Sequence, residues 1–177
     1  MLSQRIEQAM NRQMMMEIES SYTYLAMSAR FESLALPGFA AWFRAQSGEE
    51  WAHAMKFYDW ILDHDATATL DAIAAPKVDF ASPLEAFEAA LEQEQAVTRS
   101  INEVYGLSGE EKDFASQSFL NWFVTEQVEE EKTVRDILDW LRRIGDSGYG
   151  LYLMDRELAQ NPPAGSTAAE AEPTAAG

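Results

Sequence analysis

The chain has 177 residues, no cysteine and a net charge of −17, which results from 13 basic and 30 acidic side chains. This length is enough for one well-buried core, whereas the charge opposes binding to nucleic acid, because Lys and Arg neutralise phosphates in such complexes. Without cysteine the chain has neither disulfides nor thiolate metal sites, so carboxylate, imidazole or amide groups would have to hold any metal.

The first two predicted helices each have a core-facing residue at every third or fourth position. The first face comprises Ile6, Met10, Gln13, Glu17, Ser20, Tyr24, Met27, Phe31 and Leu34. Pro37 and Gly38 interrupt this pattern, and a second helix with the same spacing follows them. The second face comprises Phe39, Phe43, Gln46, Glu50, His53, Phe57, Trp60 and His64.

Two similar start signals predict a third and a fourth helix. Ser82, Pro83 and Glu85 form a capping box, with Ser at the N-cap and Pro at the first helical position. Ser108 and Glu111 repeat the pattern, which predicts that the fourth helix begins there. The third face comprises Leu84, Phe87, Leu91, Glu94, Thr98, Ile101 and Tyr105. The fourth comprises Leu120, Phe123, Gln127, Glu130, Val134, Ile137, Leu141 and Ile144. Four long helices with such faces predict an all-α four-helix bundle.

The connection between the second and third helices, residues 66–82, determines the predicted topology. A helix of about 28 residues is ~42 Å long, and about 17 extended residues reach up to ~56 Å. This link is therefore long enough for one crossover along the whole bundle, although an antiparallel return with a loose loop remains open. Residues 149–159 predict a short fifth, C-terminal helix.

One domain is expected over residues 1–160, followed by a disordered tail over residues 161–177, which are rich in Ala, Pro, Glu and Thr. No apolar run reaches the ~18 residues that a membrane helix needs, and the first apolar run contains a charge. We therefore expect a cytoplasmic protein without a membrane partner.

Polar residues interrupt the four faces near the middle of each helix. These residues are Glu17, Glu50, His53, Glu94, Gln127 and Glu130. A single polar residue on such a face usually means that the predicted phase is wrong and that the residue faces solvent. Six at one level favour a shared site in the core. Buried carboxylates repel one another and are costly without a compensating charge, and no Lys or Arg lies on any of the faces. Four carboxylates match two divalent ions, so we predict a dinuclear metal site that Glu50 bridges.

At these residues the sequence resembles the bacterial-type non-haem ferritins, a family of ferritin-like di-iron carboxylate proteins, over residues 1 to about 160. The resemblance runs through Glu17 with Tyr24, Glu49-Glu50-Trp-Ala-His53, Glu94, Trp122 and Glu126-Gln127-Val-Glu129-Glu130, and continues in residues 147–158. It implies a hollow homo-oligomeric cage of twenty-four subunits. Such a cage oxidises Fe(II) with oxygen or hydrogen peroxide, which is ferroxidase activity, and stores the ferric product as a mineral.

The resemblance also implies individual iron positions. The first would use Glu17, Glu50 and His53. The second would use Glu50, Glu94 and Glu130, with Gln127 beside it. A possible third would use Glu49, Glu126, Glu129 and Glu130. We expect Tyr24 to reach toward the first iron, because it lies seven residues after Glu17 and its Cα is ~10.5 Å further along the same face. There it would be either core packing or an electron donor. His64, at the end of the second helix, is not expected to bind metal.

Two positions depart from the related bacterioferritins. Gln127 stands where they have a second Glu-x-x-His motif, so the second metal would lack a histidine. Trp51 stands where they have the haem-binding Met, so no haem is expected. Two other functions stay open at this point, namely a di-iron oxidase or peroxide reductase without storage and a non-catalytic acidic helical module for protein partners. The identity of the native metal also stays open, because zinc often binds such sites more tightly than Fe(II).

Overall fold

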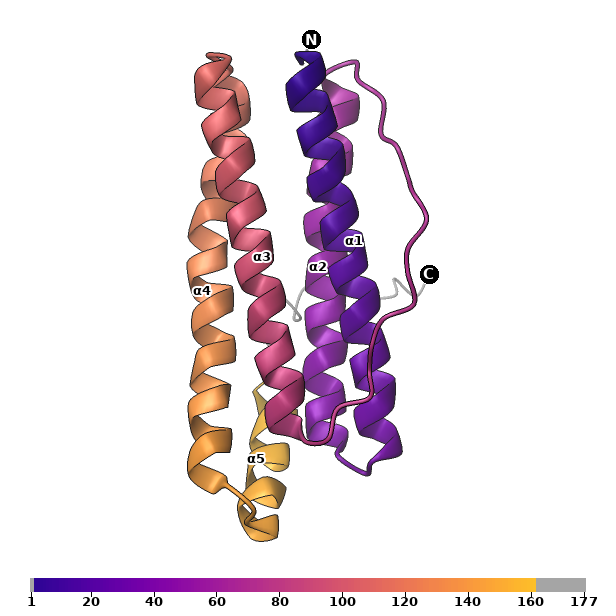
Figure 1. Ribbon diagram of the computed structural model, residues 1–177, viewed down its shortest axis with the longest axis vertical. Helices are drawn as coiled ribbons and strands as arrows, with labels where there is room; N and C mark the ends of the chain where they lie inside the picture. Colours follow the sequence, from indigo (N-terminus) through magenta and orange to yellow (C-terminus); the bar gives the residue numbers. More distant parts are fainter. Residues whose placement is uncertain (1, 162–177) are drawn as a thin grey trace, which may run out of the picture.

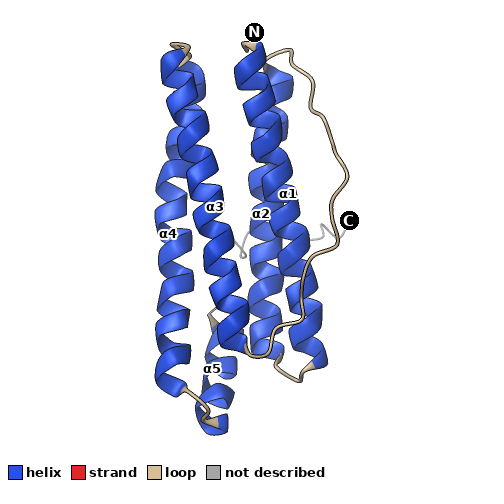
Figure 2. Ribbon diagram, in the orientation of Figure 1, coloured by secondary structure: helices blue, strands red, loops and turns tan. Residues whose placement is uncertain are grey.

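The computed structural model describes residues 2–161, which form five α-helices and no strand (Figures 1 and 2). The helices are α1 (Gln4–Ser33), α2 (Pro37–Asp63), α3 (Pro83–Glu110), α4 (Phe114–Ile144) and α5 (Gly148–Gln160). The first four lie along one long axis, and α5 lies at one end of this bundle (Figure 1). The predicted all-α four-helix bundle with a short fifth helix is confirmed. Apart from Asn161, the predicted tail falls outside the described residues. None of the five helices combines the length and apolarity needed to cross a membrane.

The connection over residues 64–82 runs along the outside of the bundle from the end of α2 to the opposite end, where α3 begins (Figure 1). This is the predicted long crossover, and the alternative of an antiparallel return is wrong. Asn11 of α1 attaches the start of the crossover, because its Nδ2 donates to the Thr67 carbonyl at 2.9 Å and its Oδ1 accepts from the Thr69 N–H at 2.6 Å. As a result α2 and α3 run in the same direction.

Helix starts follow the predicted signals at one position and depart from them at another. The Ser82 hydroxyl accepts from the Glu85 N–H at 3.2 Å, and the Glu85 carboxylate accepts from the Ala81 N–H at 2.7 Å. The predicted start of the fourth helix at Ser108 is wrong. Ser108 is buried inside α3, where its hydroxyl donates to the Val104 carbonyl at 2.9 Å instead of capping a new helix.

The actual turn between α3 and α4 lies a few residues later. Lys112 has a φ of 56°, in the left-handed region, which reverses the chain direction after α3. Asp113 is the N-cap of α4, and its Oδ1 accepts from the Ser116 N–H at 3.1 Å. Asp113 therefore takes the role that the sequence pattern assigned to Ser108.

The N-terminus of α2 receives its cap from the other end of the chain. Its own N-cap residue, Leu36, provides no side-chain acceptor. Instead Oδ1 of Asp155 on α5 accepts from the N–H groups of Gly38 at 2.8 Å and Phe39 at 3.0 Å. The contact is close enough that a Cβ on Gly38 would lie 1.6 Å from the Asp155 carbonyl oxygen. This cap attaches α5 to α2, the helix against which it mainly packs.

The bundle core consists of two apolar clusters separated by a polar layer. One cluster contains the aromatic side chains of Phe31, Phe39, Trp42, Phe43 and Phe87, and the other contains Met10, Met14, Phe57, Ile101 and Phe123. The polar layer between them comprises Gln13, Glu17, Gln46, Glu50, His53, Glu94, Gln127 and Glu130, all buried. The predicted faces are therefore the core faces for most of their length. Near the helix ends, Leu34 is 45% exposed, and five side chains are half-buried, namely Trp60, His64, Leu84, Tyr105 and Ile144. In the middle of α3 the predicted face is wrong by one residue, because Leu91 and Thr98 are only half-buried whereas Ala90 and Val97 are buried.

Candidate metal centre

The first half of the polar layer lies between α1 and α2. Two buried serines hold these helices close together, because Ser21 Oγ donates to the Ser47 carbonyl at 2.7 Å and Ser47 Oγ donates to the Ser21 carbonyl at 2.8 Å. Glu17 lies four residues before Ser21, and Glu50 and His53 lie three and six residues after Ser47. The three side chains meet between the helices. Each offers one ligand atom, and the three atoms lie within 4.8 Å of one another. This geometry matches the three ligands proposed for the first metal position.

The second half of the layer joins α3 and α4 to this group through amide and hydroxyl donors. Gln127 Nε2 donates to Glu94 Oε2 at 3.3 Å, and the Tyr24 hydroxyl donates to the other oxygen of the same carboxylate. Gln46 Nε2 donates to Glu130 Oε2 at 2.7 Å and to Glu50 Oε1 at 3.4 Å. Hydrogen bonds therefore connect carboxylates from opposite halves of the bundle at the level proposed for the second metal.

Burial raises the pKa of all four carboxyl groups in the layer. It raises that of Glu94 to about 8 and that of Glu130 to about 9, with repulsion from Glu94 adding to the second increase. The pKa values of Glu17 and Glu50 rise well above the ordinary range, again mainly through burial and then through neighbouring carboxylates. In His53, burial lowers the pKa, which favours the neutral imidazole that binds metal ions. Without a bound cation, the layer therefore favours protonated carboxyls.

Several oxygens in the layer have no hydrogen-bond donor among the described residues. They are Gln13 Oε1, Glu17 Oε2 and Gln46 Oε1, each with almost no exposed surface. An unpaired buried acceptor costs about 1–3 kcal/mol, and three of them in one layer favour a cation as the missing partner. Oxygen and imidazole donors suit Fe, Mn or Zn ions. The residues present thus fit the predicted dinuclear centre.

A second, outer group of possible ligands extends from the layer toward the surface between α2 and α4. It consists of Glu49, His53, Glu126 and Glu130, whose ligand atoms again lie within 4.8 Å of one another. Glu129, which the resemblance assigned to this position, is exposed and lies outside the group. His53 stands in the group instead. We call these four residues the outer cluster.

Three features of the site differ from the expectation or were absent from it. The Tyr24 hydroxyl donates to Glu94, a proposed ligand of the second metal position, which the sequence did not indicate. The expectation that the Tyr24 ring reaches toward the first position stays a prediction. Gln13 and Gln46 were identified as core-facing but received no role. Gln13 Nε2 donates to Glu17 at 2.8 Å, just as Gln46 donates to Glu50 four residues later in its own helix. The signal that could have found them is this shared spacing of four residues before a buried Glu.

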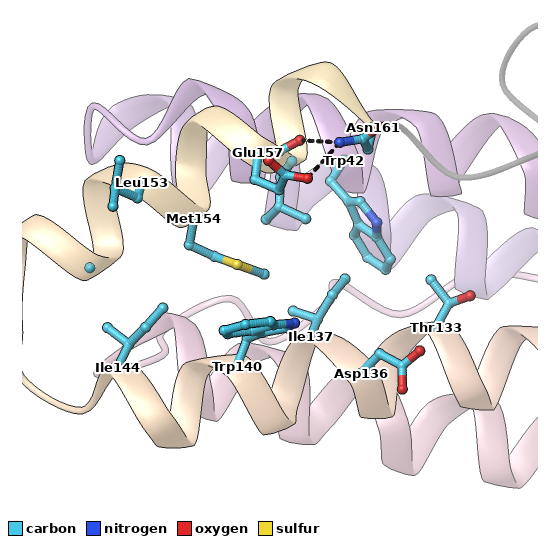
Figure 3. Close-up of a pocket in the computed structure, with 12 residues that line it drawn as sticks. Trp42, Thr133, Asp136, Ile137, Trp140, Ile144, Leu153, Met154, Glu157 and Asn161 are labelled. Atoms are coloured by element: carbon cyan, nitrogen blue, oxygen red, sulfur yellow. Dashed lines mark hydrogen bonds between the residues drawn. The ribbon is translucent and has the colours of Figure 1, made fainter.

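A separate groove of about 780 Å³ lies between α4 and α5, and its lining includes none of the carboxylates of the polar layer (Figure 3). Its walls are mainly apolar: Met154 points into it from α5, Trp140 and Ile137 line the α4 side, and Trp42 of α2 contributes an indole ring. None of the proposed metal ligands lines this groove.

Comparison with known proteins shows matches over most of the chain. Residues 7–144 match the family model described as Ferritin, the ferritin-like domain. The chain is 45% identical over 159 residues to a bacterial non-heme ferritin from Staphylococcus epidermidis, an alignment that covers 90% of this chain and 96% of the relative. It is 43% identical over 158 residues to a bacterial non-heme ferritin from Staphylococcus aureus, with coverage of 89% and 95%.

The fold matches solved structures to a similar degree. One is an open-pore ferritin from the hyperthermophilic archaeon Archaeoglobus fulgidus, with a TM-score of 0.89 and 42% identity over 90% of this chain and 98% of that one. Another is a closed form of the same ferritin made by site-directed mutagenesis, also with a TM-score of 0.89 and 42% identity. It covers 91% of this chain and 98% of the other.

Proposed function

The chain belongs to the ferritin family, and from this premise we propose that it stores iron after oxidising Fe(II) at the metal centre between its helices. The observation that carries the proposal is the buried layer, in which Glu17, Glu50, Glu94 and Glu130 are each at most 6% exposed. The unpaired oxygens of the same layer add support, because a bound cation would compensate both them and the carboxylates.

The iron positions follow from how the side chains group. We assign the first Fe(II) to Glu17, Glu50 and His53, whose ligand atoms already lie together. The second is assigned to Glu50, Glu94 and Glu130, with Gln127 beside it, so that Glu50 bridges both ions. A third Fe(II) is assigned to the outer cluster. The exposed Glu129 is kept as a possible additional ligand of this ion. No haem is proposed, since Trp51 stands where bacterioferritins have a Met ligand.

The proposed chemistry is ferroxidase chemistry with iron as the substrate. Each Fe(II) loses one electron on becoming Fe(III), so two Fe(II) and two protons reduce one O₂ to H₂O₂; hydrogen peroxide is the alternative oxidant. The carboxyls of Glu94 and Glu130, with pKa values of about 8 and about 9, give up protons as the cations enter. As carboxylates they then neutralise the higher charge of the ferric product. Reduction of O₂ beyond H₂O₂ to water needs more electrons than two Fe(II) supply, and we propose Tyr24, whose hydroxyl donates to Glu94, as the donor of one of them.

Storage requires a compartment, and for this we propose a hollow cage of twenty-four copies of the chain in the cytoplasm. The net charge of −17 supports iron uptake, because the summed negative field of such a cage attracts Fe(II).

The proposal is tested by Glu50→Ala, which removes the residue shared by both iron positions. Stopped-flow absorbance after mixing with aerobic Fe(II) should show loss of the fast oxidation phase. Asp59→Ala, which removes an exposed carboxylate from the same helix, should leave that phase unchanged. An unchanged fast phase in Glu50→Ala would refute the assigned centre.

Storage is tested separately by size-exclusion chromatography before and after iron loading. A particle of about twenty-four subunits that retains ferric iron supports the cage. A dimer that oxidises Fe(II) without retaining it would instead favour a di-iron oxidase or peroxide reductase, and a protein that binds no stoichiometric metal would favour an acidic partner-binding module.

A further inference from the structure

A lysine lies beside the outer cluster, where the proposed function requires a cation to enter. The Nζ of Lys56 lies 3.4 Å from the centroid of the Trp122 ring, which is a close cation–π contact. The same indole packs edge-to-face against His53, with ring centroids 5.3 Å apart. Trp122 thus holds the ammonium one ring away from a ligand of the outer cluster.

Helix spacing places Lys56 at the edge of the same group. On α2, Glu49, His53 and Lys56 follow one another at intervals of four and three residues, and on α4 Trp122 precedes Glu126 by four. The Lys56–Trp122 pair therefore lies about one helical turn from the outer cluster, where side chains of α2 and α4 face each other. α2 contains only one other basic residue, Arg44, which lies twelve residues earlier in the sequence.

The charges of these groups are coupled. Partial burial lowers the pKa of Lys56, while the carboxylates of Glu126 and Glu49 act in the opposite direction. In return, Lys56 contributes to the lowered pKa of His53. The ammonium thus acts on three of the four residues of the outer cluster.

We propose that the positive charge of Lys56, beside the outer cluster, weakens the binding of a divalent ion there. As a result, iron passes through this position instead of remaining in it. The inference rests on the proposed function, because it assumes that the outer cluster binds metal. A divalent ion among Glu49, Glu126 and Glu130 is repelled by the nearby ammonium. The flexible four-carbon stem of lysine and the partly exposed Trp122 ring, 41% accessible, allow the ammonium to swing aside while the ion is bound.

The effect should be largest at the outer cluster, which shares only His53 and Glu130 with the proposed inner positions. Glu17 and Glu94 are almost fully buried in the polar layer, and neither is among the groups that act on Lys56. Lys56 is thus a positioning residue for iron transit and does not take part in the oxidation itself.

The test measures the affinity for Zn²⁺ by isothermal titration calorimetry of the metal-free protein. Zn²⁺ binds carboxylate and imidazole ligands without being oxidised. The class of sites lost in Glu126→Gln identifies the outer cluster. Lys56→Met keeps an unbranched stem against Trp122 but removes the charge, and should tighten binding to that class by about three- to tenfold at low salt. Raising the ionic strength from about 0.02 M to about 0.3 M should reduce the difference, because salt screens exposed charges.

Three controls separate charge from packing. Lys56→Arg keeps the charge and should bind Zn²⁺ as the original protein does. Arg44→Met removes one positive charge from the same helix at a distant position and should have little effect. In a Glu126→Gln background, Lys56→Met should change the affinity of the remaining sites much less than it changes the affinity of the outer cluster.

The outcomes distinguish this inference from the proposed function. An unchanged affinity in Lys56→Met, or a gain equalled by Lys56→Arg, would overturn the inference while leaving the inner centre intact. If Glu126→Gln removed no class of sites, the outer cluster would not bind metal and the inference would also fail. A protein that bound no Zn²⁺ at all would refute both.

Discussion

The hydroxyl of Tyr24 donates a hydrogen bond to Glu94, which links a residue of α1 to the carboxylate that α3 contributes to the proposed metal centre. Burial and the charge of Glu94 raise the pKa of Tyr24 well above its ordinary value, so the phenol keeps its proton. The phenol is thus oriented toward Glu94, a proposed ligand of the second iron position.

Tyr24→Phe should preserve the fold and initial iron binding but slow sustained oxidation, because the phenol is no longer available as an electron donor. It should also cost about 1 kcal/mol of stability, since Glu94 loses a donor. Freeze-quench EPR in the first second after aerobic iron addition should show loss of a tyrosyl radical, whereas Tyr58→Phe should retain it. A radical of equal intensity in Tyr24→Phe would show that another residue forms it and that Tyr24 only packs in the core.

The stability of the metal-free protein should fall as pH rises. The carboxyls of Glu94 and Glu130 have pKa values of about 8 and about 9 in the folded protein and near 4.5 in the unfolded chain. Between these values the folded state binds more protons than the unfolded state, so the free energy of unfolding decreases with pH. Melting temperatures from about pH 4.5 to about pH 9 should therefore decline, and saturating Zn²⁺ should reverse most of the decline. A melting temperature that rose over this range would contradict the assigned shifts.

Glu94→Gln should stabilise the metal-free protein while weakening metal binding at the second position. The amide cannot ionise, so the variant avoids the loss of folding stability that Glu94 causes between pH 4.5 and about 8. At pH 7 its free energy of unfolding should therefore be higher by a few kcal/mol. The Gln carbonyl can still accept from Tyr24, so the hydrogen bond survives. Thermal melts at pH 4 and pH 7 measure the difference, which should be close to zero at the lower pH. Destabilisation at pH 7 would mean that Glu94 is ionised and satisfied by a basic group.

Gly38→Ala should be destabilised by at least about 2 kcal/mol, because the new Cβ would displace Asp155 and remove the cap of α2. Gly48→Ala is the matched control on the same helix. A Cβ there meets nothing within 4 Å, so the substitution should stabilise by about 0.5–1 kcal/mol through helix propensity. Chemical denaturation of both variants measures the contrast. Equal stability of the two would show that the contact between α5 and α2 contributes little.

The sequence predicted the bundle and its polar layer well, because both depend on a periodicity that continues through whole helices. Glu17, Glu50 and Glu94 could be placed at one level by counting from the helix ends, and all three lie in the buried layer. Errors arose where two local signals competed. Ser108 and Asp113 are both good N-caps, and only the packing of Ser108 inside α3 decides between them.

Contacts between distant parts of the chain could not be predicted from local patterns. Asp155 caps Gly38 across 117 residues, and nothing near either residue in the sequence indicates the other. The same applies to the partner of Tyr24, 70 residues away, which depends on how α1 and α3 are rotated against each other. Periodicity identifies which side chains face the core. Which of these side chains contact one another depends on how the helices pack.

The crossover would give the proposed metal centre a mechanical role. It separates the chain into two hairpins, α1 with α2 and α3 with α4, and the proposed ligands are divided between them, with Glu50 on one side and Glu94 and Glu130 on the other. An ion shared across this boundary would tether the hairpins at mid-height and close a loop that contains the whole crossover, as a cross-link does. Emptying the centre would release that tether and leave the hydrogen bonds of Tyr24 to Glu94 and of Gln46 to Glu130 as polar links between the hairpins. A ferritin subunit built in this way would be stiffest while it handles iron and most compliant after the iron has moved on.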